Sequence, residues 1–435
     1  MAPMLKPRAE RLAKGLWWDR SWNLVGGCTP VDESCANCWG ARVAYRLGHN
    51  PNPNVRAAYE GLTDAGGHWT GEVRFRRELL DLPLRTRKPT VWAVWMDLFH
   101  PAVSVVDCIA HAFLVMSLAP KHLFLVLTKR PGRMEQLLRG EDDDYDSELD
   151  VAITEVGDCS ANPDSDYGAS WLPTWALDEL RHRAHHTTPR GLSWPLPNVW
   201  LGTTVATQSQ ADQRIPELLR CPAALHFVSC EPLLGAVNLS RSLVSRCMVC
   251  DEDTDDCPCG GEEMAAFLDI VPEDGHWMDI LPAEPWEDTY GDRLEATLNE
   301  LVARTTRGRL GLVIAGGESG PDARPTHPDW VRSLRDQCQG AQVPFFFKQS
   351  GAWSGAGGQP NHLPHRALHW DGRSVVYDAE DQRTKPWRHV FAPDEGDMIA
   401  FLARVGKTRA GHLLDGREWL QWPGDEEIGV SGGCT

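Results

Sequence analysis

The sequence lacks long hydrophobic runs. No segment of its 435 residues approaches the ~20 consecutive apolar residues that a membrane-spanning helix needs. The opening residues, MAPMLKPRAERLAKG, also lack the apolar stretch of a signal peptide. Both absences argue against membrane and secreted proteins, so we expect a cytoplasmic protein without a membrane partner.

Basic residues are nearly absent from two stretches. Residues 141–166 contain eleven acidic residues and no Lys or Arg, and residues 251–300 contain seventeen acidic residues and one Arg. The net charge of the whole chain is −18, but these stretches carry −11 and −16, so the other 359 residues carry +9. Such acidic blocks are typical of solvated loops. The mildly basic remainder therefore does not exclude a polyanionic partner.

Three of the thirteen cysteines crowd into one short segment. Cys28, Cys35 and Cys38 lie within GGCTPVDESCANCWG. Clustered thiols in a cytoplasmic chain indicate metal chemistry rather than a disulfide framework. A structural zinc site uses four protein ligands, whereas three thiolates on a [4Fe–4S] cluster leave one iron open. The alternatives for this trio are a zinc half-site completed by ligands elsewhere, or plain packing.

Seven short apolar runs predict buried strands. They cover residues 21–28, 91–97, 122–130, 198–205, 224–232, 310–320 and 343–351. Their apolarity is nearly continuous instead of alternating, which is typical of parallel strands covered by helices on both faces. Amphipathic segments lie between them, as in HPDWVRSLRDQC. The alternation predicts an α/β fold, a complete or partial (β/α) TIM-like barrel; an open doubly wound sheet is the less favoured alternative.

Polar residues end each of these runs. The set comprises Cys28, Asp97, Lys129, Arg130, Thr204, Glu231, Glu318, Ser319, Lys348 and Gln349. In a parallel barrel the carboxyl ends of the strands share one mouth, where active sites lie. For any single residue a strand-end salt bridge is the alternative. Together they predict a site at that mouth, with Asp97, Lys129 and Lys348 as candidate catalytic residues.

Two long segments interrupt the alternation. The predicted organisation is a first part of the barrel over 1–139, an acidic insertion or lid over 140–197, barrel again over 198–239, a Cys-rich acidic insertion over 240–309, the last strands over 310–353, and a C-terminal extension over 354–435. We expect the extension to cover the barrel and to form a hairpin that turns at Asp415 and Gly416.

The second insertion contains its own thiols. They are Cys247, Cys250, Cys257 and Cys259. Four cysteines in thirteen residues suit a closed structural zinc site. Reduced thiols in an acidic loop, or a second iron–sulfur cluster, are the alternatives.

Several blocks together resemble a known family. WNLVGGCTPVDESCANCWGARVAYRLG, WAVWMDLFHPAV, HLFLVLTKRPGRM, NVWLGTTVATQSQADQRIPELL, HFVSCEPLLGAVNL, VIAGGESGPDARPTHPDWVRSLRDQC and VPFFFKQSGAW look like successive blocks of a phage-associated three-Cys-motif family, a domain of unknown function. That family distantly resembles radical SAM enzymes of the spore photoproduct lyase type. The spacing here, CxxxxxxCxxC, departs from the CxxxCxxC pattern of most radical SAM enzymes.

The resemblance implies a radical SAM-type barrel and a function. Cys28, Cys35 and Cys38 would hold a [4Fe–4S] cluster, S-adenosylmethionine (SAM) would be the second cofactor, and an electron donor would be a partner. Candidate cofactor contacts are Gly316, Gly317, Glu318, Glu231 and Asp97. Candidate substrate contacts are Lys129, Arg130, Lys348 and Gln349. The substrate class it suggests is a nucleobase or nucleotide, such as a modified thymine in phage DNA within the host cytoplasm.

Two other function classes stay open at the level of sequence. In the first, the trio binds zinc, and the protein recognises nucleic acid or a protein partner without radical chemistry. In the second, Asp97, Glu231 and Glu318 surround a divalent ion in a hydrolase or lyase.

Overall fold

A computed structural model gives the fold of the chain. The described residues are 5–139, 195–244, 246–247, 306–307, 309–355, 363–376 and 398–425, together with Leu149, Ala152, Ile153, Leu172 and Ala176. The acidic runs and the thiols of the second cysteine group lie outside these residues; of Cys247 only the backbone is described.

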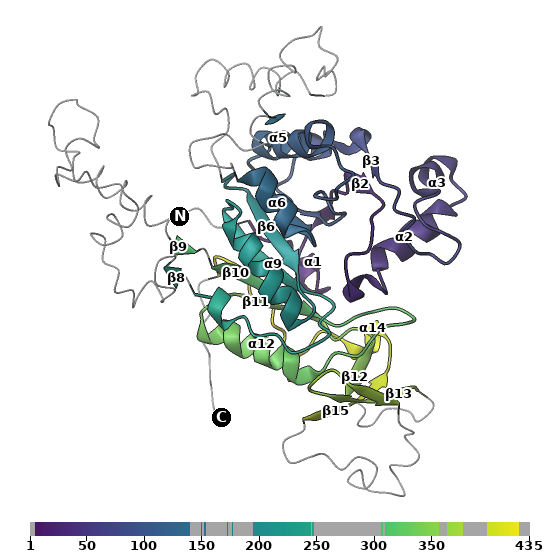
Figure 1. Ribbon diagram of the computed structural model, residues 1–435, viewed down its shortest axis with the longest axis vertical. Helices are drawn as coiled ribbons and strands as arrows, with labels where there is room; N and C mark the ends of the chain where they lie inside the picture. Colours follow the sequence, from purple (N-terminus) through teal and green to yellow (C-terminus); the bar gives the residue numbers. More distant parts are fainter. Residues whose placement is uncertain are drawn as a thin grey trace, which may run out of the picture.

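A seven-stranded sheet forms the centre of the molecule (Figure 1). Its strands are β1 (Arg20–Ser21), β4 (Val91–Val94), β5 (Leu123–Thr128), β6 (Val199–Thr204), β7 (Leu225–Cys230), β10 (Leu310–Gly316) and β11 (Phe345–Gln349). They neighbour one another in chain order, and every pairing is parallel. Six of the seven predicted runs contain a strand of this parallel sheet, and the first run, 21–28, shares only Ser21 with it.

The sheet curls into a half-barrel. Its edge strands, β1 and β11, do not pair with each other within the described residues. A doubly wound sheet would reverse its strand order at a switch point, and this order runs in one direction. The prediction of a partial β/α barrel is therefore confirmed. The described strands form neither a closed barrel nor a doubly wound sheet.

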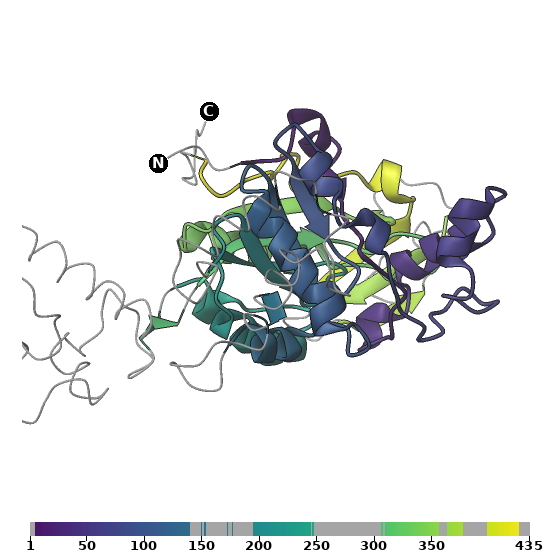
Figure 2. The same ribbon diagram turned by 90° about the horizontal axis from the view of Figure 1, so that it is seen from above.

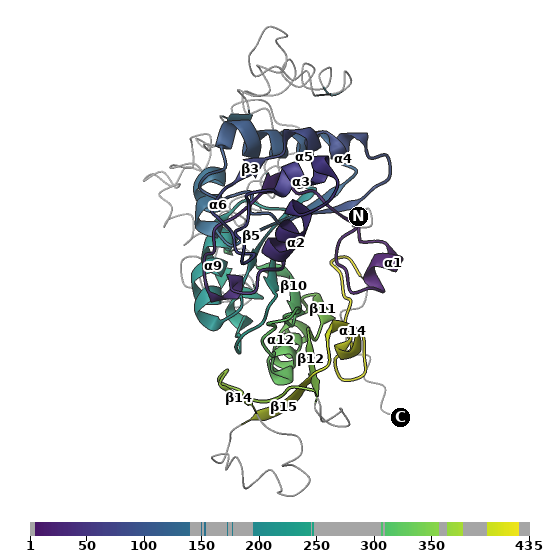
Figure 3. The same ribbon diagram turned by 90° about the vertical axis from the view of Figure 1, so that its right-hand side faces the viewer.

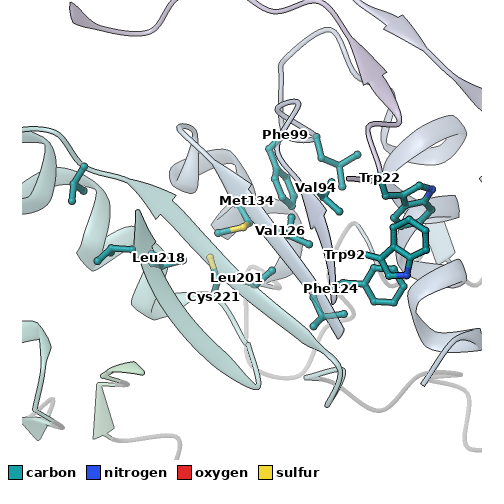
Figure 4. Packing of buried hydrophobic residues seen from close by; sticks show 14 of the residues in the cluster. Trp22, Trp92, Val94, Phe99, Phe124, Val126, Met134, Leu201, Leu218 and Cys221 are labelled. Carbon is teal, nitrogen blue, oxygen red and sulfur yellow. The ribbon is translucent and has the colours of Figure 1, made fainter. Parts of the chain in front are cut away.

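Helices cover the outer face of the sheet. They are α5 (His111–Leu118), preceded by the π-helical turn η3 (Val105–Ala110), then α6 (Pro131–Leu138), α9 (Gln208–Arg220) and α12 (Pro328–Gly340). Each follows a strand, and α12 coincides with the predicted amphipathic segment HPDWVRSLRDQC. Figure 4 shows part of this apolar layer, with Met134 beside Val126, and with Trp92 and Phe124 beside Trp22.

The inner face is filled by aromatic side chains. Trp200, Phe227 and Phe346 project from the strands and are buried. Both ends of the described chain add to this layer, since Trp17 follows helix α1 (Ala9–Leu12) and Trp422 packs on Trp200 with ring centroids 5.4 Å apart. The concave side of the half-barrel is thus a packed core, and segments distant in sequence close it.

A second, antiparallel sheet follows the last strand of the half-barrel. Its order is β12 (Trp353–Gly355), β15 (Ile399–Arg404), β13 (His365–His369) and β14 (Ser374–Val376). Figure 3 shows this sheet at one end of the molecule, close to helix α14 (Lys407–Ala410). The chain then returns to the half-barrel, where Leu420 bridges to Phe346.

The predicted hairpin in this return segment is confirmed. Leu414 and Arg417 exchange backbone hydrogen bonds, and the residues between them, Asp415 and Gly416, have φ values of 55° and 76°. Two successive positive φ angles match the turn that an Asp-Gly pair favours. Arg332 and Arg335 of α12 hold the Asp415 carboxylate at 2.7 Å, which fixes the hairpin against the barrel.

The remaining elements are short. They are η1 (Glu33–Cys35), α2 (Trp39–Gly48), α3 (Pro53–Tyr59), η2 (Arg77–Leu79), α4 (Leu82–Arg85) and η4 (Ser240–Ser242), with the paired strands β2 (Val25–Gly26) and β3 (Arg74–Phe75), and β8 (Arg246–Cys247) and β9 (Thr306–Arg307). Helices α2 and α3, purple in Figure 2, lie at one edge of the described body. In the described part of the chain, no helix has the length and apolarity to cross a membrane.

Candidate functional site

The chain leaves the central sheet well before the three-Cys loop, residues 28–38, and earlier than the sequence predicted. Strand β1 ends at Ser21, and the chain then forms β2, which pairs antiparallel with β3 instead of with the half-barrel. Gly27 ends this detour with a φ of 87°, and a Cβ there would collide with the carbonyl of Glu72. The prediction of one continuous strand over 21–28 with Cys28 at its tip was therefore wrong, because β2 has a partner outside the sheet.

Two consecutive cations at the tip of β5 meet the loop. Lys129 Nζ lies 3.3 Å from Cys35 Sγ, and an Arg130 guanidinium nitrogen lies 4.0 Å from Cys28 Sγ. Cys38 occupies the N-cap position of α2, and its side chain makes no capping hydrogen bond. All three thiols are half-buried. Two of the three sulfurs, those of Cys28 and Cys35, thus lie near positive groups.

A buried ion pair fastens the Cys28 side of the loop. Asp97, which follows β4, pairs with Arg130, and its other oxygen accepts a 2.6 Å hydrogen bond from Thr128. Arg130 also donates to the carbonyl and hydroxyl oxygens of Thr29, at 3.0 and 2.8 Å. Burial, with a smaller contribution from Asp97, outweighs the opposing effect of Arg130 and raises the pKa of Cys28 to about 11.

Asp32 fastens the middle of the loop. Its carboxylate accepts hydrogen bonds from the backbone and hydroxyl of Ser34, lies 3.8 Å from Lys129 and pairs with Arg214 of α9. Burial alone would raise the pKa of Asp32, but Ser34, Lys129 and Arg214 outweigh it and lower the pKa to about 2. The loop is thereby tied to both β5 and α9.

Glu318 fastens the far end of the loop. After β10, it accepts a hydrogen bond from the Asn37 side chain at 3.0 Å and three from Arg324, through the backbone N–H and two guanidinium nitrogens. Burial opposes ionisation, yet the hydrogen bonds from Arg324 and Asn37 lower the pKa of Glu318 below its usual value. Both carboxylate oxygens of Glu318 thus accept hydrogen bonds from the protein. Through Asn37, Glu318 holds the end of the three-Cys loop in place.

Replacing Glu318 with glutamine is expected to lower the free energy of unfolding by about 1.5–3 kcal/mol. The amide keeps one acceptor oxygen and leaves the Arg324 charge without its counterion. Urea unfolding measures the loss. Glu78→Gln is the matched control, because Glu78 pairs with Arg76 and its side chain is 62% exposed. Equal unfolding free energies for Glu318→Gln and Glu78→Gln would contradict the holding role.

Glu231 and Lys348 form a second pair on the inner face. Their charged atoms lie 2.9 Å apart, and Trp17 Nε1 donates to the other Glu231 oxygen at 3.2 Å. Lys348 Nζ also lies 5.3 Å from the ring centroid of Trp18. Both charged side chains are half-buried. They lie beside Trp17 and Trp18 at the carboxyl ends of β7 and β11.

The glycine pair and Gln349 pack against the protein itself. A Cβ at Gly316 would meet the Glu231 carboxylate, and one at Gly317 would collide with the backbone of Ser350. Gln349 is buried and donates weakly to the Gly317 carbonyl at 3.4 Å, while its Oε1 atom has no hydrogen-bond partner. The space in front of both glycines is therefore filled by neighbouring protein atoms.

The structure gathers most of the predicted site residues into two groups. Cys28, Cys35, Cys38, Asp97, Lys129, Arg130 and Glu318 surround the loop. Glu231 and Lys348 lie on the inner face with Gly316 beside them. Sequence reasoning missed Asp32, Asn37, Arg214 and Arg324; the signal for the first two was their place inside the cysteine motif itself.

The side chains around the loop can be compared with what a thiolate-bound iron–sulfur cluster needs. Three thiols with two adjacent cations suit a group that is held by thiolates and carries negative charge. In the described part of the chain, no group of three or more His, Cys, Asp or Glu side chains is arranged to hold a metal ion. The residue types fit a thiolate-bound cluster. The three thiols of the loop are not arranged as a ready-made metal site.

Comparison with protein families gives one match. Residues 13–423 match a family described as "Protein of unknown function (DUF5131)". Searches of curated proteins and of solved structures found no match. The resemblance to a family of unknown function is thus confirmed at that level, and its link to radical SAM enzymes stays a prediction. Because the match spans nearly the whole sequence, the chain belongs to the DUF5131 family.

Proposed function

We propose that this protein is a radical SAM-like iron–sulfur enzyme that acts on a nucleobase or nucleotide, such as a modified thymine in phage DNA. One observation carries the proposal. Cys28, Cys35 and Cys38 lie on a single loop that is tied to the carboxyl ends of β4, β5 and β10 in a parallel half-barrel, with Lys129 and Arg130 against the sulfurs. In parallel α/β folds that edge is where ligands bind.

The proposed roles follow from the contacts. Cys28, Cys35 and Cys38 would hold a [4Fe–4S] cluster, which, when bound, supplies the reductive cleavage of SAM to a 5′-deoxyadenosyl radical. Lys129 and Arg130 offset the charge of the thiolates. Asp32 and Glu318 keep the loop in register with the strand ends.

The inner face has a complementary role in the proposal. Glu231 and Lys348 offer one acceptor and one donor toward a polar ligand at the mouth, and the tryptophans beneath them exclude water. Glu231 and Lys348 therefore orient the ligand, while the loop supplies the thiolates.

Metal analysis of anaerobically purified protein tests the proposal. We expect about four iron and four sulfide per chain, with SAM cleaved under dithionite. Cys35→Ala should lose most of the iron and all of the SAM cleavage. Cys338→Ala, which alters a buried thiol of α12 away from the loop, is the control that should keep both.

Two results would overturn the proposal. Colourless protein with stoichiometric zinc that disappears in Cys35→Ala would favour a zinc-binding nucleic-acid or partner-binding protein. Activity that needs neither SAM nor reductant and is lost on chelation would favour a hydrolase or lyase.

A further inference from the structure

Trp39 is the most exposed large apolar side chain among the described residues. It is 55% exposed, directly follows Cys38 and begins helix α2. Its ring meets that of Trp95 edge-to-face, with centroids 6.4 Å apart and an interplanar angle of 85°. This contact orients the ring and leaves much of it open to solvent. An oriented, exposed indole beside the candidate site needs an explanation beyond packing.

The tryptophans behind it cannot form a cage for a cation. The Trp17, Trp18 and Trp95 rings are mutually perpendicular, with centroids 4.3 to 5.4 Å apart. At these separations the rings touch one another and leave no room for an ammonium group between them. The cluster instead supports Trp39 from behind, so the face available to a ligand is that of Trp39 itself, and a planar group can stack on it.

Two guanidinium groups converge beside Gly320, and one of them belongs to the same helix as Trp39. Arg42 lies one helical turn after Trp39 on the same face of α2. A Cβ at Gly320 would collide with the Arg42 guanidinium, and Arg404 of β15 donates to the Gly320 carbonyl at 2.7 Å. Gly320 has a φ of 116°, so both its conformation and its lack of a side chain keep the two arginines close together. Like charges converge in this way where an anion is bound.

Three more cations lie on helices α2 and α14. Arg46 continues the Trp39–Arg42 stripe of α2 by one further turn, while Lys407 and Arg409 follow Arg404 in α14. All three are exposed. Within the described ranges, neither these residues nor Arg42 and Arg404 form an ion pair with a carboxylate, although the chain as a whole is acidic. Trp39 thus shares helix α2 with Arg42, whose guanidinium lies beside that of Arg404 at Gly320, and neither arginine is neutralised by a carboxylate in the described ranges.

We propose that Trp39, Arg42 and Arg404 form a binding site for single-stranded nucleic acid, with an unpaired base stacked on Trp39 and the flanking phosphates on Arg42 and Arg404. Aromatic stacking combined with backbone charge is the way single strands are bound without sequence preference. Planar guanidinium groups bind phosphate in a fixed, bidentate geometry. This site would hold the strand next to Cys38. What then happens to the strand rests on the proposed function.

Fluorescence anisotropy with a labelled oligothymidylate tests the site. With the full chain, Trp39→Ala should weaken binding by about five- to hundredfold without changing its salt dependence, because stacking carries no charge. Trp39→Phe should restore part of the affinity. Arg42→Gln and Arg404→Gln should each lower the slope of log affinity against log salt by about one, because each removes one phosphate contact.

Matched controls separate the site from general effects. Met398→Ala removes another exposed apolar side chain, and Arg87→Gln removes an exposed cation that precedes β4, at the opposite edge of the sheet. Both should bind like the unaltered protein. Thymidine monophosphate and inorganic polyphosphate serve as competitors, and each should compete more weakly than the oligonucleotide, because each offers only part of the site.

The outcomes are distinguishable from those of the metal analysis. Loss of affinity in Arg87→Gln equal to that in Arg42→Gln, or unchanged binding in Trp39→Ala, would overturn the site even if iron and SAM cleavage are present. Polyphosphate competing as well as the oligonucleotide would also overturn it. Specific binding in a protein without iron would overturn the proposed function and leave the site standing.

Discussion

Replacing Asp97 with asparagine is expected to lower the free energy of unfolding by about 3–5 kcal/mol. The Asp97 and Arg130 side chains are only 9% and 13% exposed, and the substitution leaves the arginine charge buried without its partner. Arg130 also holds the Thr29 carbonyl and hydroxyl, so the Cys28 end of the loop should loosen with it. The stability loss and any loss of bound iron should therefore appear together.

Urea unfolding of matched variants measures this effect. Asp81→Asn makes the same chemical change in an exposed pair with Arg85 on α4 and should cost less than about 1 kcal/mol. Combining Asp97→Asn with Arg130→Gln removes both charges and should recover part of the loss, because no uncompensated charge remains. Equal losses in Asp97→Asn and Asp81→Asn would contradict a buried anchor at this position.

The parallel sheet was predictable because its signal is local. Runs such as HLFLVLT are apolar without alternation, which is typical of a strand buried on both faces, and helical segments follow several of them. The carboxyl edge of the sheet was predictable as well, because polar residues directly follow each run in the sequence. Strand existence, direction and the crowded edge therefore followed from short stretches of sequence.

The partners within that edge were not predictable. Asn37 and Glu318 are 281 residues apart, and nothing local in either stretch indicates that one donates to the other. Asp97 and Arg130 were each considered as ligand contacts, whereas the fold pairs them with each other. A charged residue at a strand end has a role that depends on its spatial neighbour, and sequence separation hides that neighbour.

The face on which a buried residue lies was hidden as well. In a strand apolar on both sides, alternation cannot tell the helix-covered face from the concave one. Trp17 and Trp422, from opposite ends of the chain, fill the concave face because the open half-barrel leaves it uncovered. The position of these two tryptophans depends on the curl of the whole sheet, so no local sequence pattern predicts it.

Phe227→Ala tests whether this concave core is as tightly filled as its contacts indicate. Phe227 is fully buried, contacts Trp17 with ring centroids 5.7 Å apart, and covers Gly202 on the neighbouring strand. Truncation to alanine should lower the free energy of unfolding by about 3–5 kcal/mol, as the lost contacts and the cavity add together. Urea unfolding with an unchanged m value would assign the loss to the native state.

Gly202 supplies the complementary half of this test. A Cβ at Gly202 would collide with the Phe227 ring, so Gly202→Ala should destabilise by about 1–3 kcal/mol through overpacking. Gly340→Ala in α12 is the control, because no atom lies within 4 Å of the added methyl group there. In the Phe227→Ala background the Gly202 methyl enters the cavity, and the double variant should lose less than the two single variants combined. Strictly additive losses would mean that the Phe227 ring and a methyl group at position 202 do not compete for the same space.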